Sequence, residues 1–165
     1  MATNVEAVAA SHASQPAPDT PLDRAVKLLG GRQLLRRAIR SRLDIHEAIV
    51  RGIPGGALVH MVKQVATMKT EDVLQAVGVS VRTVQRRTGA PDEPLSQEQG
   101  GRAWKFAEVL AKATEVLGSQ AEAEQWLSTP AMALDRRRPV DLLISPAGVE
   151  MVEQLLGRVE RGVYM

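Results

Sequence analysis

The sequence of 165 residues is 44% hydrophobic and 24% charged, which is typical of a globular protein and excludes a largely disordered one. It contains no cysteine, three widely separated histidines and four aromatic residues, which excludes disulfides, thiol catalysis, thiolate metal sites and an aromatic platform for single-stranded nucleic acid. The net charge is +2, and no apolar run approaches the roughly 20 residues of a membrane span. We therefore expect a cytoplasmic protein without membrane contact, metal or cofactor that works by binding.

The small net charge hides an uneven distribution along the chain. Residues 23–51 contain eight Lys and Arg against three Asp and Glu, whereas residues 92–134 contain three against seven. The basic excess of the first half could face an anionic surface such as a DNA backbone, which the acidic middle of the chain would repel. The alternative is that these charges only solvate helix faces.

Residues 1–21 predict a flexible tail. They are rich in Ala, Ser and Pro, lack periodicity, and have neither the basic start nor the continuous apolar core of a secretory signal. Thr20-Pro21 is typical of an N-cap followed by the first turn of a helix, so a short helix is predicted over residues 22–29. Gly30-Gly31 would end that helix.

A basic amphipathic helix is predicted over residues 32–42, and Asp44 is predicted to cap a short helical turn that reaches Ile49. The role of residues 22–51 as a whole is left open by their residue types. They could widen a dimer interface, reach a protein partner, or contact DNA through Arg32, Arg36 and Arg40.

The first informative pattern predicts three short helices: 57–66, 71–77 capped by Thr70, and 81–87 capped by Ser80. Gly78-Val79-Ser80 joins the second to the third, and glycine at the first turn position is typical of a helix-turn-helix because it tolerates positive φ. The third helix would then present side chains that hydrogen-bond base edges and phosphates: Ser80, Arg82, Thr83, Gln85, Arg86 and Arg87. The alternative is a trihelical core whose arginines only keep it in solution.

Ser96 and Gln99 have the spacing of a capping box and predict the start of the longest helix, which Gly118 would end. Trp104 lies off the apolar stripe of this helix, so it either packs against a neighbouring helix or marks a dimer contact. A further helix with an acidic outer side is predicted over residues 121–127.

The second informative pattern is C-terminal. A basic turn over residues 135–139 precedes a short segment over 140–144, and Ser145-Pro146 predicts the start of a final helix that cannot easily continue after Gly162. The inner face of that helix is apolar: Val149, Val152, Leu155, Leu156 and Val159. Val163-Tyr164-Met165 then forms an apolar stub, which either folds back on its own core or inserts into a partner.

From about Gly52 onward the sequence resembles the Xre/MbcA/ParS family of antitoxins, which accompany RES-domain toxins in bacteria. The first part of the resemblance is a Cro-repressor-like helix-turn-helix, with Gly52-Ile53-Pro54 at its entry and Gly78-Val79-Ser80 through Arg86-Arg87 at its centre. The second part is the toxin-binding domain, whose residues follow the family's order and spacing: Ala123, Trp126-Leu127, Thr129-Pro130, Ala133-Leu134, Arg138-Pro139, Leu142-Leu143, Gly148, Leu155-Leu156, Arg158 and Gly162-Val163-Tyr164.

One position departs from the family pattern. The loop before Pro139 usually has glycine, whereas this sequence has Asp135-Arg136. Asp tolerates left-handed backbone geometry better than Arg does.

The resemblance implies an all-α fold with a helix-turn-helix domain over residues 52–95, a connecting or dimerisation helix over 96–118 and a toxin-binding domain over 119–165. It also implies a homodimer in a stable complex with a toxin that degrades NAD. The C-terminal domain would block the toxin's active site, and the helix-turn-helix would bind the promoter DNA of its own operon and repress it. We expect seven residues to bind the toxin: Arg138, Arg158, Gly162, Val163 and Tyr164 from the resemblance, and Arg161 and Met165 because they belong to the same terminal segment.

Two other functions are alternatives to this one. A stand-alone dimeric helix-turn-helix transcriptional regulator would use residues 96–165 for dimerisation or effector sensing. An enzyme is disfavoured because the sequence has no paired carboxylates in a cleft-forming pattern, no phosphate-binding glycine loop after a strand, and no nucleophile with a base. No catalytic or metal-binding residue is therefore predicted.

Overall fold

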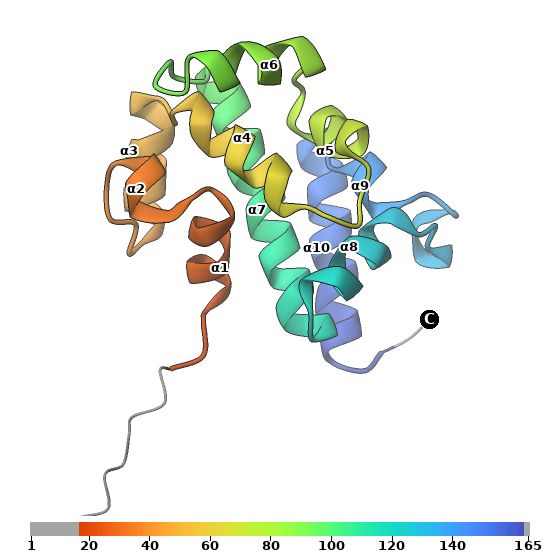
Figure 1. Ribbon diagram of the computed structural model, residues 1–165. Helices are drawn as coiled ribbons and strands as arrows, with labels where there is room; N and C mark the ends of the chain where they lie inside the picture. Colours follow the sequence, from red (N-terminus) through yellow and green to blue (C-terminus); the bar gives the residue numbers. More distant parts are fainter. Residues whose placement is uncertain (1–16, 164–165) are drawn as a thin grey trace, which may run out of the picture.

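The computed structural model describes residues 17–163, and throughout this range the chain forms helices joined by turns (Figure 1). The predicted all-α fold is confirmed. Most of the predicted tail (residues 1–16), together with Tyr164 and Met165, lies outside the described residues.

The first helix, α1 (Pro21–Leu28), begins as predicted. The backbone N–H of Asp23 donates to Thr20 Oγ1 at 3.2 Å, and the N–H of Thr20 donates to the Asp23 carboxylate at 3.0 Å. This reciprocal capping box satisfies a backbone donor that a helix start leaves free. The hydrogen bonds from Thr20 also hold the pKa of Asp23 below its usual value.

The predicted helix over residues 32–42 is wrong. The structure has α2 (Gly31–Leu35) and α3 (Arg42–Arg51), with an irregular segment between them. Arg36 adopts left-handed geometry (φ 57°) and ends α2. A run of apolar residues at helical spacing does not reveal such a break, because the break is a property of one backbone position.

The start of α3 also lies three residues before the predicted one. Ser41, and not Asp44, is the N-cap, and its Oγ accepts the N–H of Asp44 at 3.2 Å. Asp44 accepts the N–H of Arg40 at 2.8 Å, so both side chains stabilise the first turn.

The next three helices correspond to the predicted ones within two residues at each end: α4 (Gly55–Gln64), α5 (Thr70–Val77) and α6 (Val81–Gly89). Thr70 is the first residue of α5 and not its cap, because Lys69 occupies the N-cap position. Ser80 caps α6 as predicted.

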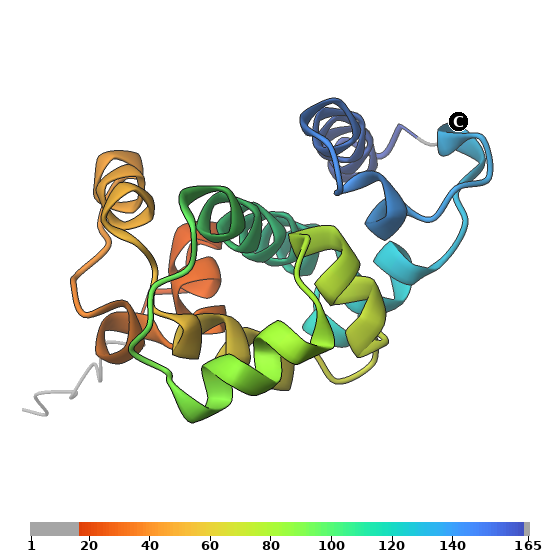
Figure 2. The same cartoon turned by 90° about the horizontal axis from the view of Figure 1, so that it is seen from above.

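The longest helix, α7 (Gln97–Leu117), is central to the fold. Ser96 and Gln99 form the predicted capping box, and Gly118 ends the helix in left-handed geometry. The helices α1, α3, α5, α8 and α10 pack around α7 (Figures 1 and 2). Trp104 is buried in this core, in agreement with the first of its two predicted roles.

Four elements follow α7: α8 (Gln120–Ser128), the 3₁₀ turn η1 (Met132–Leu134), α9 (Pro139–Leu142) and α10 (Pro146–Glu160). Ser145 caps α10 as predicted by accepting the N–H of Gly148 at 3.1 Å. A Cβ at Gly148 would collide with the carbonyl oxygen of Leu142, so α9 and α10 are in close contact. The predicted inner face of α10 is buried, with Val159 half-buried at its end.

The loop before Pro139 adopts left-handed geometry although it lacks glycine. Asp135 and Arg136 have φ of 53° and 62°. The Arg136 N–H donates to the carbonyl of Ala131 at 3.0 Å, and the Ala131 N–H donates to the carbonyl of Arg137 at 3.0 Å. These two hydrogen bonds close the loop on itself and hold both residues in place.

One continuous hydrophobic core includes side chains from α1 to α10. None of the helices within residues 17–163 combines the length and the apolar character that a bilayer-spanning helix requires.

Candidate functional site

The turn between α5 and α6 has the geometry of a helix-turn-helix. Gly78 is left-handed (φ 76°), and its N–H donates to the carbonyl of Leu74 at 2.8 Å. The N–H of Val79 donates to the same carbonyl at 3.0 Å. A Cβ at Gly78 would displace the guanidinium of Arg102, which is the mobile end of a long side chain, so the need for glycine at this position comes from its positive φ.

The exposed face of α6 gathers most of the residues predicted to contact DNA. Ser80 Oγ accepts the N–H of Thr83 at 3.1 Å, which fixes the start of the helix. Five of the predicted side chains line one shallow hollow: Ser80, Arg82, Thr83, Gln85 and Arg86. In Figure 1, α6 lies at the outer edge of the molecule, where a long anionic polymer has access to it. Guanidinium, amide and hydroxyl groups in this arrangement can bind phosphates and base edges.

Arg87 does not belong to this face. Its side chain is only 5% exposed, its Nη1 lies 2.7 Å from the Glu93 carboxylate, and its methylenes pack against Gly55 at the start of α4. We therefore correct the prediction that Arg87 contacts DNA. The helical period contains the signal, because Arg87 is three residues after the half-buried Val84 and therefore faces inward.

Arg138, predicted to bind toxin, is engaged within the chain. Its Nη1 and Nη2 donate to the two carboxylate oxygens of Asp72 in α5 at 3.0 and 3.1 Å, and its Nε and Nη2 donate to Asp141 at 2.9 and 2.6 Å. The hydrogen bonds to Asp141 and Asp72 raise the pKa of Arg138 above its usual value. The geometry gives Arg138 a structural role at the contact between α9 and α5.

The end of α10 carries the other predicted toxin-binding residues that the structure describes. Arg158 is half-buried, and Arg161 is exposed. Gly162 is left-handed (φ 70°), and the Val163 N–H donates to the carbonyl of Arg158 at 3.0 Å, which closes the helix. Val163 is 46% exposed. Tyr164 and Met165 lie outside the described residues.

Glu124 is a buried carboxylate that sequence reasoning placed on the acidic outer side of α8. It is 1% exposed and accepts the backbone N–H groups of Thr67 and Met68 at 2.5 and 3.1 Å. Gln120 donates to its other oxygen at 2.7 Å. Only the tertiary fold reveals this role, because the donors belong to the loop between α4 and α5.

Glu124, Arg102 and Arg138 together join the C-terminal half of the chain to the helix-turn-helix. Arg102 in α7 donates to the carbonyl of Ala76 at 3.2 Å from Nε and at 3.1 Å from Nη2, at the end of α5. The α5 helix is thus held near its beginning by Arg138, at its end by Arg102, and through its preceding loop by Glu124. This arrangement fixes the position of α5, and with it the turn that leads into α6.

Comparison with known proteins gives the same two-part division. Residues 44–108 match the family model described as the antitoxin Xre-like helix-turn-helix domain. Residues 112–162 match the antitoxin Xre/MbcA/ParS C-terminal toxin-binding domain. The two matches identify the helix-turn-helix domain and the toxin-binding domain. The predicted domain bounds at residues 52, 96 and 119 stay predictions.

Individual relatives carry the name antitoxin Xre. One from Yersinia enterocolitica is 32% identical over 100 residues, which are 60% of this chain and 67% of the relative. One from Pseudomonas putida is 27% identical over 125 residues, or 75% of this chain and 76% of the relative. One from Photorhabdus laumondii is 25% identical over 107 residues, or 64% and 72%.

The fold and these matches define the class: a helix-turn-helix protein with a C-terminal toxin-binding domain, which is an antitoxin of a toxin–antitoxin system. Within that class, the chain belongs to the Xre antitoxin family.

Proposed function

We propose that this antitoxin neutralises a RES-domain toxin that degrades NAD, and that its C-terminal domain does so by covering the toxin's active site. The observation that carries the proposal is the match of residues 112–162 to a toxin-binding domain that ends with an exposed helix terminus. A segment that blocks a site needs shape and rigidity and no catalytic groups of its own. The α10 helix, buried along one face and closed at Gly162, would present Val163, Tyr164 and Met165 on such a support.

We further propose that the complex represses its own operon by binding promoter DNA as a homodimer. The exposed face of α6, with Arg82, Gln85 and Arg86, supports this part because its donors suit the major groove. A dimer would place two copies of α6 on successive half-sites. Arg87 is not part of the proposed DNA-binding set.

Co-expression with a RES-domain toxin tests the proposal. Bacteria that produce the toxin together with this chain should keep growing and keep their NAD, and the two proteins should purify as one complex. A stand-alone transcriptional regulator would bind its operator and leave the toxin active. Growth arrest and NAD loss in the presence of the folded chain would therefore contradict the antitoxin pairing proposed here.

A further inference from the structure

We propose that an exposed apolar crest of α3, formed by Leu43 and Val50, inserts into a hollow between α7 and α10 of a second copy of this chain. The second copy would insert its own crest into the first in return. This inference rests on the proposed homodimer. It assigns the dimer contact to named residues and gives residues 22–51 a role.

The crest of α3 consists of Leu43 and Val50, which lie two helical turns apart and point away from the core. Leu43 is 66% exposed and Val50 is 49% exposed. His46 lies between them on the same face, and Arg42 flanks them with an exposed side chain. The opposite face of α3 packs into the core through Ile45 and Ala48, so the crest has no partner within the described residues.

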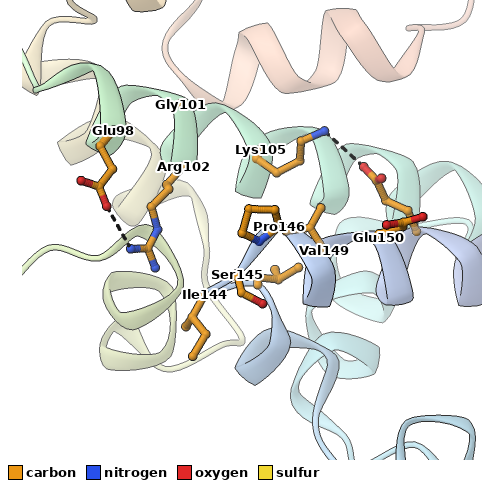
Figure 3. A pocket seen from close by; sticks show the side chains of 11 residues that line it. Glu98, Gly101, Arg102, Lys105, Ile144, Ser145, Pro146, Val149 and Glu150 are labelled. Atoms are coloured by element: carbon orange, nitrogen blue, oxygen red, sulfur yellow. Dashed lines mark hydrogen bonds and ion pairs between the residues drawn. The ribbon is translucent and has the colours of Figure 1, made fainter.

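The hollow lies between the first half of α7 and the start of α10 and has a volume of about 490 Å³ (Figure 3). Its floor is apolar, with Val149, Pro146 and the 50%-exposed Ile144. Its rim carries three carboxylates, Glu98, Glu150 and Glu153, and two basic groups, Arg102 and Lys105, so one carboxylate is in excess. Two rim carboxylates have a basic partner in the same hollow, because Lys105 lies 3.3 Å from Glu153 and Arg102 lies 4.0 Å from Glu98.

The crest and the hollow lie on one side of the molecule. In Figure 2, α3 and α10 protrude on the same side of α7 and leave α7 between them. The ion pairs confirm this placement, because Glu108 of α7 reaches Arg42 in α3 at 3.5 Å and Lys105, one turn earlier in α7, reaches Glu153 in α10. A two-fold axis through this face would carry the α3 of each copy toward the α10 of the other.

Chemistry favours a second copy as the occupant. The crest is apolar and flanked by the exposed Arg42, and the hollow is apolar with one carboxylate in excess on its rim. The two surfaces therefore complement each other mainly through their apolar side chains, and the excess charges have opposite signs. Three of the chain's most exposed large apolar residues, Leu43, Val50 and Ile144, would be covered. In a two-fold dimer each contact occurs twice, so the two crests together bury twice the area that one crest buries in one hollow.

Sedimentation equilibrium of the full chain at micromolar concentration tests the inference. We expect the unaltered chain to be a dimer. Leu43→Glu should raise its dissociation constant at least about tenfold, because an apolar anchor is lost and a negative charge faces a rim that has one carboxylate in excess. Leu43→Lys removes the same apolar surface but carries the opposite charge, so its increase should be smaller. Met132→Glu, at an exposed apolar residue of η1, is the matched control and should leave the dimer unchanged.

Cross-linking identifies the partner of the crest directly. Because the chain has no cysteine, a mixture of Leu43→Cys chains and Ile144→Cys chains offers a short thiol cross-linker only these two positions. A covalent dimer should form in the mixture, and a mixture of Leu43→Cys with Met132→Cys should give none.

Three results would overturn the inference: a monomeric unaltered chain, a Leu43→Glu dimer of full strength, or equal losses for the Lys and Glu variants. A monomer that still suppresses the toxin would leave the proposed function intact and refute only the dimer contact. Loss of toxin binding by Leu43→Glu without a change in oligomeric state would assign the crest to the toxin instead.

Discussion

The long polar side chains of α6 point in two directions, although they lie within six positions of one short helix. The residues concerned are Arg82, Gln85, Arg86 and Arg87. The first three are exposed on α6, whereas Arg87 turns inward to Glu93. Only Arg82 and Arg86 of the three arginines in α6 therefore belong to the exposed face. The proposed DNA contact can be tested by replacing these two side chains.

Replacement of both Arg82 and Arg86 by Ala should weaken binding to promoter DNA. Each phosphate contact that is lost should reduce the slope of log K against log salt by about 0.9. Fluorescence anisotropy with labelled promoter at several salt concentrations measures that slope. Arg137→Ala, an exposed arginine in the loop after η1, is the control and should leave the slope as it is. An unchanged slope for the double variant would reassign the α6 arginines to a structural or solubilising role.

The sequence predicts where most helices begin, but it does not predict the break between α2 and α3. Caps at Thr20, Ser80, Ser96 and Ser145 are predictable because each acts on a backbone group three residues away. The break at Arg36 is not predictable in this way. Arg36 has a left-handed backbone, and its side chain forms an ion pair with Asp92, which is far away in the sequence, in the segment after α6. The buried role of Glu124 and the contact of Arg138 with Asp72 are hidden from the sequence in the same way, because their partners are 56 and 66 residues away. The inward direction of Arg87 could have been predicted from the helical period, and the toxin contact of Arg138 stays a prediction.

Two glycines of α10 should respond to alanine in opposite directions. Gly148→Ala would drive a Cβ into the carbonyl of Leu142, so the free energy of unfolding should fall by about 1–3 kcal/mol. Gly157→Ala would meet only the guanidinium of Arg161 at ordinary contact distance, so better helix propensity should raise the free energy by about 0.5–1 kcal/mol. Urea denaturation followed by circular dichroism measures both. Equal stability of the two variants would contradict the close contact between α9 and α10.

At the scale of the whole molecule, polar contacts join the toxin-binding half to the helix-turn-helix. The bidentate pair of Arg138 and Asp72 is the most direct of them, because it connects the start of α9 to α5. The half of the chain that matches the toxin-binding domain is therefore in direct contact with the half that would meet DNA.

Arg138→Ala should lower the free energy of unfolding by about 1–3 kcal/mol, because it leaves the carboxylates of Asp72 and Asp141 without their shared donor. Asp72→Ala should cost less once Arg138 has been removed, and a double-mutant cycle in urea should give a coupling energy of about 0.5–3 kcal/mol. Strictly additive losses would show that the pair does not hold the two halves together.

The central proposal is that the C-terminal end of this antitoxin covers the active site of an NAD-degrading toxin. The most direct measurement is NAD consumption by the purified toxin, titrated with the full chain and with a chain lacking residues 163–165. The full chain should stop NAD consumption at molar equivalence, and the shortened chain should bind the toxin yet leave NAD consumption running. Complete inhibition by the shortened chain would contradict the account.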